Sequence, residues 1–163
     1  MKFTNSLIKG KLLKRYKRFF ADIKVNNKII TAHCPNTGSM QGLLDEGNEV
    51  LVTEHDDSKR KLKFTLEIIK AKKRYVGVNT HRANKIVNHG LENKLISEFK
   101  FIKNIKPEFK FSDDTRFDFL CDSYLIEVKN VTLFRENDIA EFPDAVTSRG
   151  TKHLNMLIKS IKK

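Results

Sequence analysis

Three residues in the stretch TRFDFLCDSYLIEVKN have side chains that could do chemistry together: Asp118, Glu127 and Lys129. Two carboxylates brought close together repel each other unless a cation lies between them, and an all-oxygen ligand set suits Mg²⁺ or Mn²⁺. A lysine beside such a metal ion can position, or help to deprotonate, a water molecule that attacks a phosphodiester. The residue types therefore predict metal-dependent chemistry on a phosphate.

The alternation of apolar and polar residues predicts that one hairpin carries all three side chains. Residues 115–121 and 124–130 each alternate like a strand, and a turn-like Cys-Asp-Ser separates them. Pairing these strands would bring Asp118 close to Glu127 and leave Lys129 one pleat further on. The arrangement resembles the D…(D/E)-x-K signature of PD-(D/E)XK nucleases. The alternative is a solvated hairpin on which Glu127 and Lys129 form only a surface ion pair.

Length and composition define the class of protein. A chain of 163 residues with 39% apolar residues can build a packed core in one large or two small domains. It contains neither an apolar run of membrane-spanning length nor a signal-peptide stretch, so we expect a cytoplasmic protein without a membrane partner. Cys34 and Cys121 are expected to be ordinary thiols, and no further Cys or His motif supports a zinc site.

The formal charge of +12 is unevenly distributed. Residues 1–90 carry 19 Lys and Arg against 8 Asp and Glu, whereas residues 91–163 carry 13 against 12. An AT-rich genome also raises the lysine content, but it does not explain this asymmetry. The pattern favours a basic part that holds a polyanion, joined to a near-neutral part with an acidic site. Ribosomal and membrane-surface proteins can have a similar charge.

Residues 7–78 show short strand patterns separated by polar turns, which predicts a small antiparallel barrel. The predicted strands cover residues 7–14, 18–25, 29–33, 49–53, 61–69 and 75–78.

Basic residues are interleaved with aromatic ones at the start of this barrel, a mixture that suits phosphate contact and base stacking. The predicted nucleic-acid-binding residues here are Lys14, Arg15, Tyr16, Lys17 and Arg18. The nearby Phe19 and Phe20, with Phe64, could instead fill the barrel.

The second half of the chain reads as helix, strand, strand, strand, helix. A helical pattern covers residues 83–99 with a break at Gly90, a strand covers residues 101–111, and the last helix covers residues 144–163. This order is how a PD-(D/E)XK core begins.

Several longer phrases resemble the sugar fermentation stimulation protein A family of bacteria and archaea. They are LLKRYKRFFADI, TAHCPNTGSMQGLL, VGVNTHRAN, TRFDFL, YLIEVKNVTL and FPDAVTSRGTKHL. The resemblance implies an α+β/α/β chain, with an OB-fold β-barrel in residues 1–82 and a partial PD-(D/E)XK restriction-endonuclease-like domain in residues 83–163. It also implies DNA binding and a regulatory role in sugar (maltose) metabolism.

Carried over residue by residue, the resemblance makes Asp118 and Glu127 ligands of Mg²⁺ or Mn²⁺, joined by the carbonyl group of Val128. Lys129 would orient the water and stabilise developing charge. Glu98, at the end of the first helix of this domain, would bind the metal ion or a ligating water. The alternative for Glu98 is an exposed carboxylate at a helix end.

Three residues near the start of the last helix, Arg149, Lys152 and His153, are expected to contact a phosphate next to the scissile one. Their alternative is an ordinary solvated helix face. Members of the family usually continue beyond this helix, so we expect an exposed apolar face on the last helix or the third strand. The partner is expected to be DNA, and the chain could form a homodimer.

The sequence is compatible with two functions. We predict DNA binding and leave open whether the protein also cleaves DNA. The first is a DNA-binding protein of low sequence specificity, whose affinity falls steeply with salt. The second is a Mg²⁺- or Mn²⁺-dependent DNA endonuclease that uses Asp118, Glu127 and Lys129. RNA binding is a third, weaker alternative, because OB barrels accept either polymer.

Overall fold

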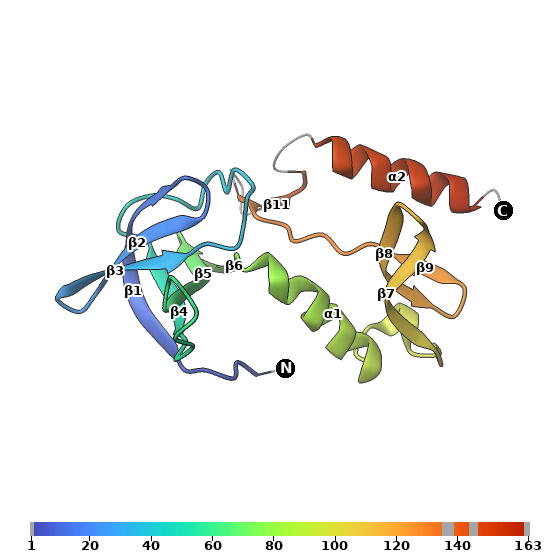
Figure 1. Ribbon diagram of the computed structural model, residues 1–163, viewed down its shortest axis with the longest axis horizontal. Coiled ribbons are helices and arrows are strands. Elements are labelled where there is room, and N and C mark those ends of the chain that lie inside the picture. The colour runs from blue at the N-terminus through green and yellow to red at the C-terminus, as the bar shows by residue number, and fades with distance from the viewer. Residues whose placement is uncertain (1, 135–138, 144–146, 162–163) are drawn as a thin grey trace. The chain divides into compact units, whose positions relative to one another are not determined.

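The computed structural model describes residues 2–134, 139–143 and 147–161 (Figure 1). Its internal contacts divide the chain into two units. Lys2–His81 and Asn130–Ala145 form what we call the barrel unit, and Arg82–Lys129 with Val146–Lys163 form what we call the α/β unit. The contacts thus group Asn130–Ala145 with the barrel unit. The predicted division into one domain of residues 1–82 and another of residues 83–163 stays a prediction.

The barrel unit is a closed β-barrel in which all neighbouring strands are antiparallel except one parallel pair, and this confirms the predicted OB-like fold (Figure 1). Its strands run in the order β3-β2-β1-β4-β5-β6, and a parallel pairing of β3 with β5 closes the sheet. Their bounds are Leu7–Tyr16 (β1), Phe20–Val25 (β2), Lys28–His33 (β3), Glu49–Glu54 (β4), Phe64–Ala71 (β5) and Arg74–Gly77 (β6). The short strands β10 (Leu133–Phe134) and β11 (Ala140–Glu141) pair with each other.

Alternating apolar residues of the barrel strands point inward and form its core. Leu12, Ile23 and Leu66 are fully buried within this cluster. Gly10 lets β1 approach β2 closely, because a Cβ atom there would lie 2.6 Å from the Cγ2 atom of Ile23. A shift in register between Leu12 and Lys14 bends β1 as a β-bulge does, as closing a barrel requires.

The α/β unit follows the predicted order of helix, three strands and helix (Figure 1). Its helices are α1 (Ala83–Glu92) and α2 (Ser148–Ile161), and its sheet has the order β7-β8-β9. The strands are β7 (Ile105–Ser112), β8 (Thr115–Cys121) and β9 (Tyr124–Ile126). Two short 3₁₀ helices, η1 (Thr80–Arg82) and η2 (Ser97–Phe99), precede and follow α1.

Helix α1 packs on this sheet through a small apolar cluster. Leu91 of α1 is buried with Phe119 and Cys121 of β8. The helix runs through Gly90, so the predicted break there was wrong. Instead, the missing side chain lets Ile96 pack against the helix, since a Cβ atom on Gly90 would lie 3.2 Å from the Cγ1 atom of Ile96.

Helix α2 exposes apolar side chains, as the sequence predicts. Leu154, Ile158 and Ile161 are 62%, 54% and 85% exposed. Within the residues that the structure describes, neither helix combines the length and the apolar character that crossing a membrane requires.

Candidate functional site

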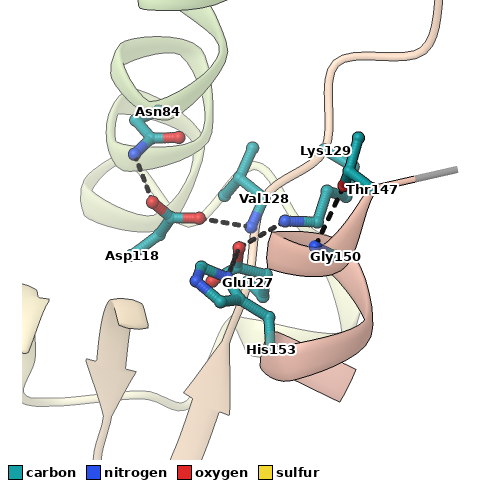
Figure 2. A network of polar contacts seen from close by, with 8 residues as sticks. All are labelled: Asn84, Asp118, Glu127, Val128, Lys129, Thr147, Gly150 and His153. Atoms are coloured by element: carbon teal, nitrogen blue, oxygen red, sulfur yellow. Dashed lines mark hydrogen bonds and ion pairs between the residues drawn. The ribbon is translucent and has the colours of Figure 1, made fainter. Parts of the chain in front are cut away.

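The hairpin of β8 and β9 ends earlier than predicted, and Asp118 is the reason. Phe119 and Ile126 form the last pair of the ladder, although the pattern predicted a second strand through residue 130. Beyond this pair the Asp118 carboxylate accepts a hydrogen bond from the backbone nitrogen of Val128 at 2.7 Å. The Asp118 side chain thus replaces a backbone carbonyl as the acceptor of the Val128 amide. Glu127 therefore lies just past the end of the strand pairing, near Asp118 (Figure 2).

Both carboxylate oxygens of the half-buried Asp118 are held by donors. Oδ2 accepts the Val128 amide, and Oδ1 accepts the side-chain amide nitrogen of Asn84 at 2.6 Å (Figure 2). Asn84 lies in the first turn of α1, so the helix orients the carboxylate of the strand on which it packs. Sequence reasoning missed Asn84, because its partner lies 34 positions away.

Glu127 is fixed from two sides at a single oxygen. The Lys129 ammonium contacts Oε1, and the Nδ1 atom of His153 lies 2.5 Å from the same atom (Figure 2). A carboxylate only accepts, so Nδ1 of His153 carries the hydrogen. The Glu127 and His153 side chains are 9% and 13% exposed, which makes this contact largely buried.

The position of His153 depends on how α2 begins. Thr147 precedes the helix, and its hydroxyl oxygen accepts a hydrogen bond from the Gly150 nitrogen at 3.0 Å (Figure 2). A threonine at this place is a favoured N-cap, because it satisfies an amide of the first helical turn. The capped helix then presents His153, one and a half turns later, to Glu127.

Asp118 and Glu127 supply the type of ligand, carboxylate oxygen, and the number of carboxylates that a hard cation such as Mg²⁺ takes from a protein. Mg²⁺ usually takes one or two protein carboxylates and completes its shell with waters and substrate phosphates. Because both donors to Glu127 use Oε1, the ligand we expect from this side chain is Oε2. Among the described residues, however, no group of three or more His, Cys, Asp and Glu side chains is arranged to hold a metal ion.

Glu98, the predicted third ligand, lies in η2. Its carboxylate is exposed and accepts a hydrogen bond from the Ser97 hydroxyl at 2.6 Å, and this bond lowers the pKa of Glu98. Glu98 thus lies beyond α1, which ends at Glu92 and not at the predicted residue 99, and its described contacts do not bring it to Asp118. Its role as a ligand stays a prediction.

The remaining residues predicted at the start of α2 have different surroundings. Lys152 reaches the turn between β7 and β8, where its Nζ atom lies 2.7 Å from the Oδ2 atom of Asp114. This contact, with help from the Ser112 hydroxyl, lowers the pKa of Asp114 to about 2. The side chain of Arg149 lies outside the described part of the chain, and phosphate contact by these residues stays a prediction.

The basic residues predicted on the barrel differ in how free their side chains are. Lys14 is exposed, and its Nζ atom lies 3.7 Å from the Oδ2 atom of Asp22 and 5.4 Å from the ring centre of Tyr16. Tyr16 stacks on Phe20 with ring centres 5.5 Å apart. Arg15 is half-buried, and its guanidinium donates to the carbonyl oxygens of Arg18, Asn36 and Gly38, which ties the β1–β2 turn to a neighbouring loop.

Two other lysines of the barrel, which sequence reasoning did not single out, face each other across β1 and β2. Lys11 is the register partner of Lys24, and both side chains are exposed. Like charges directly opposite each other destabilise a sheet. Lys9, two residues before Lys11, instead has a carboxylate partner, with its Nζ atom 2.5 Å from Glu49.

The β1–β2 turn carries the predicted pair Lys17 and Arg18 in an unusual backbone conformation. Their φ angles are +48° and +63°, and both side chains are exposed. Turns with positive φ at two successive positions favour Asn-Gly, because Cβ lies too close to a carbonyl oxygen in this conformation; Gly has no Cβ, and the short Asn side chain can hydrogen-bond locally. The β2–β3 turn follows that preference with Asn26, at a φ of +51°.

Comparison with known proteins agrees with this architecture. The family description "SfsA N-terminal OB domain" matches residues 13–78, and "Sugar fermentation stimulation protein RE domain" matches residues 81–163. A sugar fermentation stimulation protein homolog of Pelagibacter ubique is 64% identical over 167 residues, covering 100% of this chain and 72% of the relative. A homolog of Alteromonas mediterranea is 46% identical, covering 94% of this chain and 69% of the relative.

A solved structure has the same fold. SfsA of Pyrococcus furiosus, described as a complex with Ca²⁺, superposes with a TM-score of 0.81 at 24% identity and covers 98% of this chain and 68% of its own. At this identity the likeness establishes the fold alone. Together with the two family matches and the identity of the bacterial relatives, it leads to one conclusion: the chain belongs to the sugar fermentation stimulation protein family.

Proposed function

We propose that this chain binds DNA through the outer face of β1 and β2 in the barrel unit. The observation that carries the proposal is the facing pair of exposed lysines, Lys11 and Lys24, a placement of like charges that sheets disfavour; on its other side Lys11 faces Glu49 of β4. A polyanion lying on this face would turn the repulsion into attraction, because each phosphate neutralised by a cation also releases counterions. In sugar fermentation stimulation proteins, such binding would serve a regulatory role in sugar (maltose) metabolism.

The β1–β2 turn supports the same face. Lys17 and Arg18 occupy left-handed positions, and each such position costs on the order of 1–3 kcal/mol relative to a favoured residue. Backbone strain of this kind is often retained where the side chains have a function. In OB barrels this turn, strands 2 and 3 and the loop between strands 4 and 5 commonly bind oligonucleotides.

The remaining parts of an OB binding face are also basic or aromatic. The loop between β4 and β5 includes Lys59, Arg60, Lys61 and Lys63. The stacked and half-buried rings of Tyr16, at the end of β1, and Phe20, at the start of β2, lie beside the exposed Lys14. Aromatic rings next to cations bind bases and phosphates with little sequence preference.

A double substitution in the turn separates function from stability. Lys17→Asn with Arg18→Gly installs the residues that this backbone favours and removes two charges. We expect a higher melting temperature, weaker binding to a duplex in fluorescence anisotropy, and a log–log salt slope shallower by about 1.8. Lys94→Gly is the matched control, because Lys94 also has a positive φ, +55°, but lies in the α/β unit. Unchanged DNA affinity in the double variant would overturn the proposal.

A second candidate function is Mg²⁺- or Mn²⁺-dependent DNA cleavage by the α/β unit. The contact of Lys129 with Glu127, beside an Asp118 held by two donors, favours it. In this proposal Asp118 and Glu127 hold the metal ion, which supplies Lewis-acid stabilisation, and Lys129 orients the attacking water. The Ca²⁺ of the Pyrococcus furiosus relative is consistent with a cation site in this family.

Cleavage is tested on labelled single-stranded, duplex and branched DNA with Mg²⁺, Mn²⁺ or EDTA. Metal-dependent cutting that disappears in Asp118→Asn and Lys129→Met, while binding persists, would establish the enzyme. Band shifts without cutting, equal in all three proteins, would leave a DNA-binding protein with an idle nuclease-like site. Preferential binding of RNA oligomers would redirect the proposal to RNA.

A further inference from the structure

A cavity of about 370 Å³ opens beside Asp118, inside the α/β unit. One wall is a face of α1, and the other is formed by neighbouring positions of β7 and β8. Its volume lies within the range of ligand pockets in proteins, roughly 300–1,000 Å³. The cavity therefore has room for a small molecular group next to the proposed metal ligands.

The helical wall is rich in hydrogen-bond acceptors. Asn84, Asn88 and Glu92 follow one another at intervals of four residues, which places them on one face of α1. The amide nitrogen of Asn84 donates to Asp118, and that of Asn88 donates to Oε1 of Glu92 at 2.8 Å. Both amide groups are oriented by these carboxylates, so each carbonyl oxygen is the atom that can accept from a ligand.

The strand wall combines apolar and acidic groups. Pro107 and Phe119 are register partners on β7 and β8, and both line the cavity. Glu108 follows Pro107 at a φ of +52°, at the position opposite Asp118 in the antiparallel register. Phe119 is only 2% exposed, so the exposed Pro107 supplies the accessible apolar surface beside the two carboxylates.

The charge of the lining decides which part of a nucleotide could enter. Glu92, Glu108 and Asp118 line the cavity, and Lys85 is the one lysine or arginine among its described lining residues; Arg116, outside the lining, lies 3.8 Å from the Glu108 carboxylate. A phosphate would meet net repulsion there. A flat, uncharged ring with an amino group would instead pack on the apolar wall and donate hydrogen bonds to the acceptors.

We propose that the cavity receives an unpaired nucleobase with an exocyclic amino group, that is cytosine, adenine or guanine but not thymine, from a strand held at Asp118 and Glu127. This inference rests on the proposed binding of DNA and names its substrate class as single-stranded or frayed DNA. The base must be unpaired because a base inside a duplex is stacked and its amino group is engaged. Thymine lacks the amino group and presents carbonyl oxygens to a wall of acceptors.

The test compares the binding of oligo-dC, oligo-dA and oligo-dT of equal length by anisotropy, with Ca²⁺ and at constant salt. We expect oligo-dC and oligo-dA to bind about tenfold more tightly than oligo-dT. Asn88→Phe, which fills the cavity, and the milder Glu92→Gln, which replaces a carboxylate acceptor by an amide, should both reduce this ratio towards one. In NMR spectra, the side-chain amides of Asn84 and Asn88 should shift with dCMP but not with dTMP.

The outcomes separate this inference from the one on which it rests. Absence of binding to all three oligomers by a chain that still binds a duplex would overturn the cavity proposal alone, whereas absence of binding to the duplex as well would overturn the proposed function itself. Equal affinity for the three, or a preference that both variants retain although their spectra show a folded chain, would overturn the cavity proposal alone. Amide shifts caused equally by dCMP and by spermidine would also overturn it, since the cavity would then select cations and not bases.

Discussion

His153 on helix α2 and Glu127 at the end of the β8–β9 hairpin are joined by a contact of 2.5 Å between Nδ1 and Oε1. Lys129 contacts the same oxygen, so one carboxylate atom accepts from two donors. This arrangement restricts the rotation of Glu127 and directs Oε2 away from both donors. The structure thus places His153 against the proposed metal ligand Glu127, and phosphate contact by His153 stays a prediction.

Removing this support should weaken metal binding. We expect His153→Ala to lower the affinity for Mn²⁺, measured by calorimetry, by about tenfold, because outer-shell partners typically contribute 10–100-fold to metal affinity. His153→Gln keeps a donor and should recover most of the loss. Equal affinities of the wild type and His153→Ala would show that the contact does not prepare the site.

Asn84 should have a similar effect on the other carboxylate. Asn84→Leu removes the donor to Asp118 and is expected to lower Mn²⁺ affinity by about tenfold. Asn88→Ala is the matched control, because Asn88 lies one turn later on α1 and donates to Glu92 instead. A loss of equal size in both variants would point to a general disturbance of the helix.

Removing one of the facing lysines, Lys11 and Lys24, should raise the stability of the barrel and lower its affinity for DNA. Lys24→Gln relieves the repulsion with Lys11 and should raise the free energy of unfolding by about 0.2–1 kcal/mol in urea denaturation. The same variant should bind duplex DNA more weakly, with a salt slope shallower by about 0.9. Lys9→Gln changes the charge equally but removes the ion pair with Glu49, so it should not stabilise the barrel.

The ion pair between Lys152 and Asp114 predicts a pH effect. The pKa of Asp114 is lowered to about 2, below its ordinary value of 3.8, so the folded state binds this proton less readily than the unfolded state. Its contribution to stability is therefore present above about pH 4 and is lost as the pH falls towards 2. In an NMR titration of the carboxyl carbon, Lys152→Met should move the midpoint up towards 3.8.

Lys159→Met is the control for that titration, because Lys159 lies in the last turn of the same helix. It removes the same charge from α2 and should leave the midpoint of Asp114 unchanged. A midpoint near 3.8 in the wild type would mean that Lys152 does not hold Asp114 in solution.

The sequence predicted the elements of both units well, because the apolar residues repeat with the period of the element that buries them. On β8, for example, Phe117 and Phe119 are buried whereas Arg116 is exposed. The end of β9 was wrong because no pattern reveals that the Asp118 side chain accepts from the Val128 backbone. Gly90 was misjudged because a local rule cannot include a contact with Ile96.

Relationships between distant residues were beyond the reach of sequence patterns. The pairing of Lys11 with Lys24 depends on the register on one side of the bulge in β1, and a shift of one residue would have separated them. Asn84 and His153 reach Asp118 and Glu127 only after the helices have packed on the hairpin. Residue types that could do the chemistry were therefore recognisable, and the residues that orient them were not.

The most direct test of DNA binding by the barrel is an NMR titration of the ¹⁵N-labelled chain with a short DNA duplex at low salt. It reports binding and its location in the same spectra. We predict that the backbone amides of Lys11, Lys17, Arg18 and Lys24 shift progressively and that added salt reverses these shifts. Unchanged spectra at saturating duplex, or shifts that leave the amides of β1, β2 and their turn unaffected, would contradict the proposal.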